Sequence, residues 1–183
     1  MTKRYSRALI AMTAFGVMES AALAPLPAVA AGEAPAKMLL VFHSMYGVDG
    51  PFVGNAFPQR GIPGDELPWT VATANGWLDT DGHLTVQVKG VVFTDDKEVP
   101  PALRGTNDEP TFRVAISCIT EKNEQIVRRN VITAPFPATS TGDARVVTTV
   151  ELPNPCVEPT AFILAGSEFK WFAVVGFEEE EDE

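Results

Sequence analysis

The clearest pattern in this chain is a two-residue alternation of apolar and polar side chains. Leu84, Val86 and Val88 alternate with polar neighbours, and the stretches 111–120 and 143–152 repeat the pattern. Side chains of a strand point to opposite faces in turn, so this period predicts strands with one buried face. No window after residue 31 sustains the 3.6-residue apolar period of an amphipathic helix. The sequence therefore predicts an all-β domain.

Turn-forming residues divide the domain into about seven strands. Clusters of Asp, Asn, Gly and Pro, such as Asp79–Gly82 and Pro153–Pro155, mark the boundaries. The predicted strands lie near 69–77, 83–93, 111–120, 126–133, 143–152, 159–165 and 169–177. Short strands at this spacing favour an antiparallel β-sandwich, for which we expect an immunoglobulin-like order. A jelly roll or a barrel remains an alternative.

Residues 1–31 have the composition of a cleavable export signal. They combine a basic start, a short apolar core over residues 8–18, and small residues at Ala28 and Ala30. The apolar run falls short of the roughly 18 residues that a membrane span requires. We expect cleavage near Ala30 and Ala31 and a secreted or periplasmic protein without a membrane span. A retained short anchor is the alternative.

Two cysteines, Cys118 and Cys156, follow the signal. An even count in an exported chain predicts one disulfide. In an immunoglobulin-like order the third and sixth predicted strands are antiparallel neighbours, which brings these two residues together. The bridge would close a loop of about 38 residues, worth about 4 kcal/mol in the chain-entropy model.

The chain carries a formal net charge of −10. This charge argues against nucleic acid and against docking on anionic membranes, because both need clustered Lys and Arg. We divide the chain into the signal, a linker over 32–37, one domain over 38–177 and an acidic tail over 178–183. Six adjacent carboxylates repel one another, so the tail is expected to be disordered and solvated.

The stretch before the first long strand is rich in glycine and proline but holds enough apolar residues to pack. Met38–Phe42 is an apolar pentad with the composition of an edge strand. We expect the following segment, 44–66, to form an ordered loop across one end or face of the sandwich. Ordered long loops are common places for function, so this loop is the predicted contact surface for a protein or a glycan.

No catalytic residue emerges from the sequence. His43 stands next to Ser44, but neighbouring side chains on an extended chain point to opposite faces and do not pair. No G-x-S-x-G turn is present. The remaining catalytic hypothesis is a hydrolase using carboxylates in loops: Asp95, Asp96, Glu98, Asp108 and Glu109.

Two further hypotheses concern small ligands. Trp69 and Trp77 share one face of the first predicted strand and would form an aromatic platform for a sugar if that face were exposed; core packing is the alternative. Asp79 and Asp81 stand in a D-x-D-G sequence that resembles the start of a calcium loop. A hairpin turn explains the same residues. Calcium is therefore the one candidate cofactor.

Several short phrases, taken in order, resemble a group of uncharacterised exported bacterial proteins. They are Gly50–Asn55, Arg60–Gly64 with Leu67–Trp69, Leu103–Asn107, Phe136–Thr139 and Leu152–Cys156. The resemblance covers most of residues 38–177. It implies a bacterial exported domain and lends neither an activity nor a catalytic residue.

The sequence thus predicts a non-catalytic binding or structural module. A small secreted hydrolase and a carbohydrate- or calcium-binding module are the alternatives. An enzyme would show a hollow with converging polar groups. A sugar-binding protein would expose two aromatic faces in one plane, whereas an interaction module would offer a loop surface or an open sheet edge. The oligomeric state is not predicted.

Overall fold

The structure is a computed structural model that describes residues 35–176. The predicted signal peptide, the first part of the linker and the acidic tail lie outside the described residues.

The described chain consists of strands, one short 3-10 turn and no α-helix. The elements are β1 (Met38–Phe42), β2 (Met45–Gly47), η1 (Gly50–Phe52), β3 (Trp69–Thr70), β4 (Thr73–Asp79), β5 (His83–Lys89), β6 (Val92–Phe93), β7 (Thr111–Lys122), β8 (Gln125–Ile132), β9 (Phe136–Pro137), β10 (Ala144–Thr149), β11 (Val157–Ala165) and β12 (Trp171–Val175). Sheet A has the order β1-β4-β5-β10, and sheet B has the order β2-β12-β11-β7-β8 with β9 beside β7. A two-stranded sheet joins β3 and β6.

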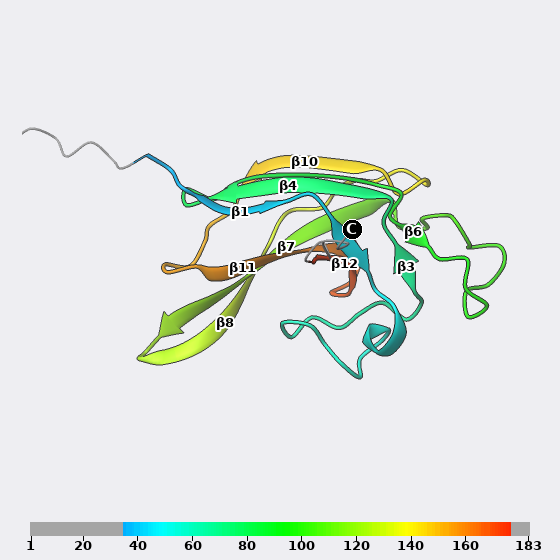
Figure 1. The fold of residues 1–183 in the computed structure, drawn as a ribbon, viewed down its shortest axis with the longest axis horizontal. Coiled ribbons are helices and arrows are strands. Elements are labelled where there is room, and N and C mark those ends of the chain that lie inside the picture. The colour runs from blue at the N-terminus through cyan, green and yellow to red at the C-terminus, as the bar shows by residue number, and fades with distance from the viewer. Residues whose placement is uncertain (1–34, 177–183) are drawn as a thin grey trace, which may run out of the picture. The chain divides into compact units, whose positions relative to one another are not determined.

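Sheets A and B form two layers around one core, as Figure 1 shows. Leu84, Val86 and Val88 of β5 are buried, as the alternating pattern predicts, and so are Val114 and Ile116 of β7. Neighbouring strands are antiparallel throughout the described part. The predicted all-β, antiparallel sandwich is confirmed.

The predicted disulfide is present and joins adjacent strands. Cys118 of β7 bonds to Cys156, which directly precedes β11, and β7 pairs antiparallel with β11 as expected. The immunoglobulin-like connectivity is not confirmed. β4 and β5 form a hairpin within sheet A, and β10 pairs with β5 at the far side of that hairpin. The disulfide also lies within one sheet, whereas in immunoglobulin domains it connects the two sheets.

The first two predicted strands are each shorter than expected. The stretch 69–77 divides into β3 and β4, and 83–93 divides into β5 and β6. The break between β3 and β4 and the break between β5 and β6 lie side by side, where Ala72 contacts Gly90. Gly90 has a φ of +64°, and a Cβ on it would lie 2.7 Å from the Cβ of Ala72. The glycine therefore allows the backbones to turn and approach closely, which ends both strands.

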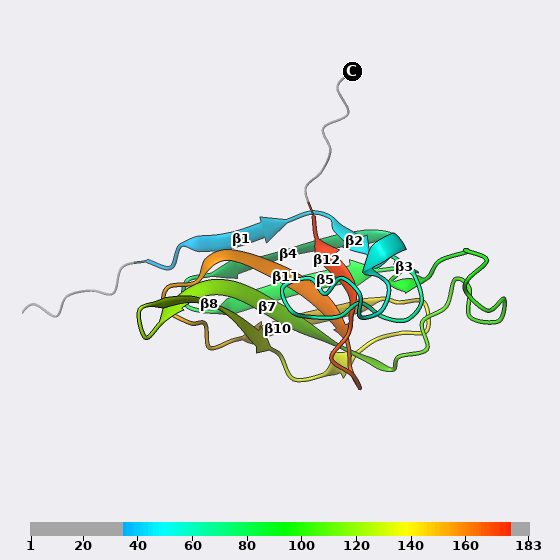
Figure 2. The same ribbon diagram turned by 90° about the horizontal axis from the view of Figure 1, so that it is seen from below.

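The segment between β2 and β3 is an ordered loop across the outer face of sheet B, the face turned away from sheet A. Ile62 is fully buried, and the carbonyl of Pro63 accepts a hydrogen bond from the Trp171 amide at 2.9 Å. Asn130 of β8 donates to the Arg60 carbonyl at 3.2 Å. In Figure 2 this cyan segment passes in front of β11 and β12. The expected loop over 44–66 is therefore found only after residue 47, because Met45–Gly47 forms strand β2 of sheet B.

Candidate functional site

Two adjoining hollows form a trough along β1, and we call them together the edge trough. Their volumes are about 420 and 590 Å³, and Leu39 lines both. The first is lined by Leu39, Thr80, Leu152, Pro153, Asn154, Pro155 and Cys156, and the second by Leu39, Leu40, Arg60, Glu158, Pro159, Thr160, Val175 and Gly176. Most of these side chains are apolar, and Arg60 and Glu158 are the charged residues among them.

Strand β1 forms one wall of the edge trough. It pairs with β4 on one side and stands at the end of sheet A, so its other edge is unpaired within the described residues. Leu39 and Leu40 are partly buried and pack against the core, whereas Met38 and Val41 are 61% and 55% exposed. The apolar pentad is therefore the edge strand that its composition predicted.

The start of β11 forms the opposite wall. β12 pairs with β11 only over Phe162–Leu164, which leaves the preceding residues of β11 without a neighbour on that side in the described chain. Glu158 has a φ of +48°, and the pairing with β7 shifts register between Val157 and Thr160. Pro159 has no amide hydrogen. This bulged edge is a poor template for another strand, so β1 is the edge available for pairing.

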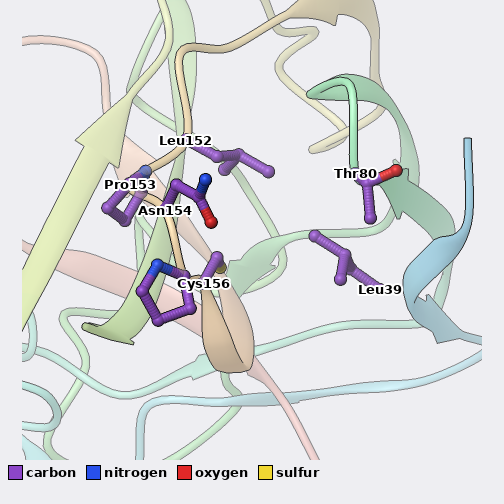
Figure 3. A pocket seen from close by; sticks show the side chains of 7 residues that line it. Leu39, Thr80, Leu152, Pro153, Asn154 and Cys156 are labelled. Carbon is purple, nitrogen blue, oxygen red and sulfur yellow. The ribbon is translucent and has the colours of Figure 1, made fainter. Parts of the chain in front are cut away.

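The disulfide borders the first hollow. Leu39 and Thr80 face Leu152, Asn154 and Cys156 across it, as Figure 3 shows. Because Cys156 is bonded to the fully buried Cys118, the wall that carries it is tied to the core of sheet B.

One charged pair, Arg60 and Glu158, is part of the lining of the second hollow. The Arg60 guanidinium lies 3.4 Å from the carbonyl oxygen of Glu158 and 3.8 Å from its carboxylate. The Glu158 side chain is 75% exposed, which makes this ion pair weak and easily exchanged. Arg60 is thus a cation in a lining that is mostly apolar.

Trp69 and Trp77 do not form one aromatic face. Trp69 is buried, stacks on Phe172 at 3.9 Å between ring centroids, and donates its indole N–H to the Asp65 carboxylate at 2.9 Å. Trp77 lies in another sheet and alternates with the buried Leu78, so it is on the outer face of sheet A. The prediction that they share a strand face was wrong because the strand breaks before Thr73.

Asp79 caps the turn between β4 and β5. Its carboxylate accepts hydrogen bonds from the amides of Asp81 and His83, at 3.0 and 2.9 Å, and lies 2.9 Å from the His83 Nδ1. Burial alone would raise the pKa of Asp79, but the hydrogen bonds from His83 outweigh it and lower the pKa. Among residues 35–176, no group of three or more His, Cys, Asp or Glu side chains is placed to hold a metal. The contacts of Asp79 are those of a hairpin turn, and a calcium site at Asp79 and Asp81 stays a prediction.

A separate acidic hollow lies beside Trp69. It has a volume of about 230 Å³ and is lined by Asp65, Glu66, Leu67, Trp69, Phe93, Leu103, Asp108, Glu109, Ala165, Glu168 and Phe172. Burial raises the pKa of Asp65, although hydrogen bonds from Trp69 and Leu67 oppose the rise. Of the predicted loop carboxylates, Asp108 and Glu109 reach this hollow, whereas Asp95 pairs instead with Arg104 at 3.3 Å.

The sequence analysis did not predict a site at the edge trough. The pentad at 38–42 and the Pro-rich turn at 153–155 are visible in the sequence, but no local pattern indicates that they face each other. The one available signal was the disulfide, which brings the Pro-rich turn to β7.

Comparisons with protein-family models, with curated proteins and with solved structures found no match to this chain. The resemblance to exported bacterial proteins therefore stays a prediction. In the part of the chain that the structure describes, no helix has the length and apolar character needed to cross a membrane. The disulfide is typical of an oxidising environment outside the cytosol.

Proposed function

We propose that this protein is an exported, non-catalytic module that binds an extended segment of another polypeptide in the edge trough. The observation that carries the proposal is the edge of β1 that no strand among residues 35–176 pairs with, which lies beside two mainly apolar hollows that share Leu39. An extended peptide added to β1 would satisfy the free backbone groups of that edge. Its alternate side chains would enter the two hollows.

The chemistry of the trough favours a polypeptide over other ligands. Its walls are built mainly from Leu, Pro and Val side chains, which bury apolar groups, while strand edges supply backbone hydrogen bonds. A sugar site is less supported because Trp69 is buried and Trp77 lies in another sheet. We infer secretion through the signal at 1–31, with which the disulfide is consistent.

A hydrolase in the acidic hollow is less supported because its carboxylates already serve structural contacts. Asp65 accepts hydrogen bonds from Trp69, and Glu109 accepts one from the Ser167 hydroxyl at 2.6 Å. Glu66 pairs with Lys170, whose pKa is raised by its hydrogen bonds with Glu168 and Glu66. These contacts give Asp65, Glu66 and Glu109 structural roles that need no substrate.

Peptide selection tests the proposal. Oxidised protein of residues 32–183 is used to enrich binders from a random 12-residue peptide library displayed on phage, and their affinities are measured by calorimetry. We expect peptides with alternating apolar residues. Leu39→Lys should weaken their binding by more than about tenfold, because it places a charge in both hollows.

Val147→Lys is the matched control. Val147 is 65% exposed on β10, the opposite edge strand of sheet A, and does not line the trough. This variant should bind the peptides like the unmodified protein, and melting curves should show that both variants are folded. Failure to enrich any peptide, or equal binding by the Leu39→Lys variant, would overturn the proposal.

A further inference from the structure

Arg60 occupies a backbone conformation that a long side chain rarely adopts. It stands with Gly61 at the tip of a two-residue hairpin turn, in which the amides of Gln59 and Ile62 donate to each other's carbonyl oxygens at 2.9 and 2.8 Å. The φ angles of Arg60 and Gly61 are +50° and +77°. Such angles favour Asn or Gly in a turn of this kind. An arginine at this strained position therefore points to a role for its side chain outside the turn.

Contacts with sheet B hold the Arg60 side chain in the wall of the edge trough. Asn130 of β8 donates to the Arg60 carbonyl at 3.2 Å, which fixes the tip of the turn. The Arg60 side chain is only 26% exposed and lines the second hollow among mainly apolar residues. A guanidinium that is partly removed from water attracts an opposite charge more strongly than one in solvent.

Glu158 is an internal example of the group that Arg60 binds. It also lines the second hollow, and its carboxylate lies 3.8 Å from the Arg60 guanidinium. At this distance, and with 75% of the Glu158 side chain exposed, the pair is loose. The carboxylate of a ligand can replace that of Glu158 and accept two parallel hydrogen bonds from the guanidinium.

We propose that the polypeptide bound in the edge trough carries an acidic residue, and that Arg60 binds its carboxylate in the second hollow; this proposal rests on the proposed function. An extended segment that pairs with β1 turns alternate side chains toward the hollows. The acidic residue should therefore stand an even number of positions from the apolar residues that fill them.

The charges around the turn favour an anion, although the whole chain is acidic. The guanidinium carbon of Arg128 is 3.8 Å from the position that a Cβ on Gly61 would take. Arg128 forms no ion pair with any residue in the described range 35–176. Two arginines thus accompany one glutamate, Glu158, around the turn. The formal net charge of −10 acts over longer distances, where physiological salt screens exposed charges beyond about 8 Å.

Matched peptide libraries test the role of the acidic residue. Two random 12-residue libraries, with Glu or with Gln fixed at the sixth position, are displayed on phage and selected against the oxidised protein of residues 32–183. The Glu library should yield the tighter binders, with apolar residues at even spacings from the fixed Glu. Replacing that Glu by Gln in a selected peptide should weaken binding by at least about tenfold. Equal affinities of the two peptides would overturn the inference.

The substitution Arg60→Asn separates recognition from stability. Asn suits the turn at least as well as Arg, so the melting temperature should not fall. The acidic peptide should nevertheless bind at least about tenfold more weakly, while its Gln counterpart binds as before.

Arg145→Gln is the control for Arg60→Asn. It removes one positive charge from β10, at the opposite edge of sheet A and outside the trough lining. Both peptides should bind this variant like the unmodified protein. Equal losses in the Arg60 and Arg145 variants would indicate a general effect of charge and would contradict binding by Arg60.

Glu158→Gln should act in the opposite direction from Arg60→Asn. It removes the internal carboxylate with which the ligand competes, so the acidic peptide should bind about two- to fivefold more tightly. Weaker binding would show that Glu158 itself contributes to the contact and would contradict the exchange of carboxylates at Arg60.

The outcomes distinguish this proposal from the proposed function. Peptides that depend on Leu39, but neither on an acidic residue nor on Arg60, would overturn the proposal and leave the proposed function standing. Acidic peptides that need Arg60 but bind equally to the Leu39→Lys variant would support the carboxylate site and contradict strand addition at β1. Failure of both libraries to yield a binder would overturn both.

Discussion

Asp65 illustrates how one side chain joins a loop to the core of this protein. Its carboxylate accepts the indole N–H of Trp69, and its amide donates to the Trp171 carbonyl at 3.2 Å. Its partial burial disfavours the charged form and raises its pKa above the ordinary value near 3.8. The loop on sheet B and the aromatic cluster around Trp69 are therefore connected through a carboxylate that resists ionisation.

The substitution Asp65→Asn tests this role through the pH dependence of stability. A raised folded-state pKa means that Asp65 contributes stability at low pH, and that this contribution is lost as pH rises through the folded pKa. Relative to the Asp65→Asn variant, the unmodified protein should lose free energy of unfolding as the pH rises from about 3 toward 7. Urea unfolding of both proteins measures the difference. Parallel pH profiles would contradict a raised pKa.

Among the elements, the loop between β2 and β3 is anchored by two fully buried apolar side chains, Val48 and Ile62. Ile62 is fully buried, although it lies in a glycine- and proline-rich segment. The adjacent backbone hydrogen-bonds to Trp171, so the Ile62 side chain and the backbone pairing hold the same part of the loop to sheet B. Arg60, which lines the edge trough, is positioned by this attachment.

Replacement of Ile62 should destabilise the protein measurably. Ile62→Ala removes buried methyl groups and leaves a cavity, which typically lowers the free energy of unfolding by about 2–4 kcal/mol. Ile126→Ala is the control, because Ile126 is 79% exposed on β8 and its truncation should cost less than about 0.5 kcal/mol. Urea unfolding at neutral pH compares the two. Equal effects would show that the loop is not held by burial of Ile62.

At the scale of the whole molecule, the disulfide joins two strands that are distant in sequence. Cys118 and Cys156 are 38 residues apart, and the hairpin and crossover between them include β8, β9 and β10. The bond limits the conformations of the unfolded chain and fixes the wall of the trough that carries Cys156. Stability and the shape of the edge trough are therefore linked through one bond.

Removal of the disulfide should lower the free energy of unfolding by about 2–5 kcal/mol, since the loop that it closes is long. Chemical unfolding of the oxidised protein and of the Cys118→Ala, Cys156→Ala double variant provides the comparison. Thiol counting on the denatured, oxidised protein checks the premise and should detect no free thiol. Two free thiols would contradict the pairing and the role of the bond in the trough.

Much of the fold was predictable because burial is encoded locally. The period-two patterns of β5 and β10 indicated which side chains face the core, and cysteine spacing indicated that β7 and β11 are neighbours. In β7 the pattern was less informative, because Ala115 and Ser117 on its polar face are fully buried as well. The limits of β3 and β4 were not predicted, because the break at Ala72 depends on close approach to Gly90, a contact between residues on different strands.

The sequence by itself determined the strand class, the disulfide and the pentad that becomes an edge strand, since each depends on composition or spacing within a short stretch. Only the tertiary structure decided which strand edges stay unpaired and what faces them. The edge trough combines Leu39, the Pro-rich turn at 153–155, the bulge at Glu158 and the end of β12. Alternation specifies the faces of a strand but not its neighbours, and a binding surface formed by distant neighbours has no local signature.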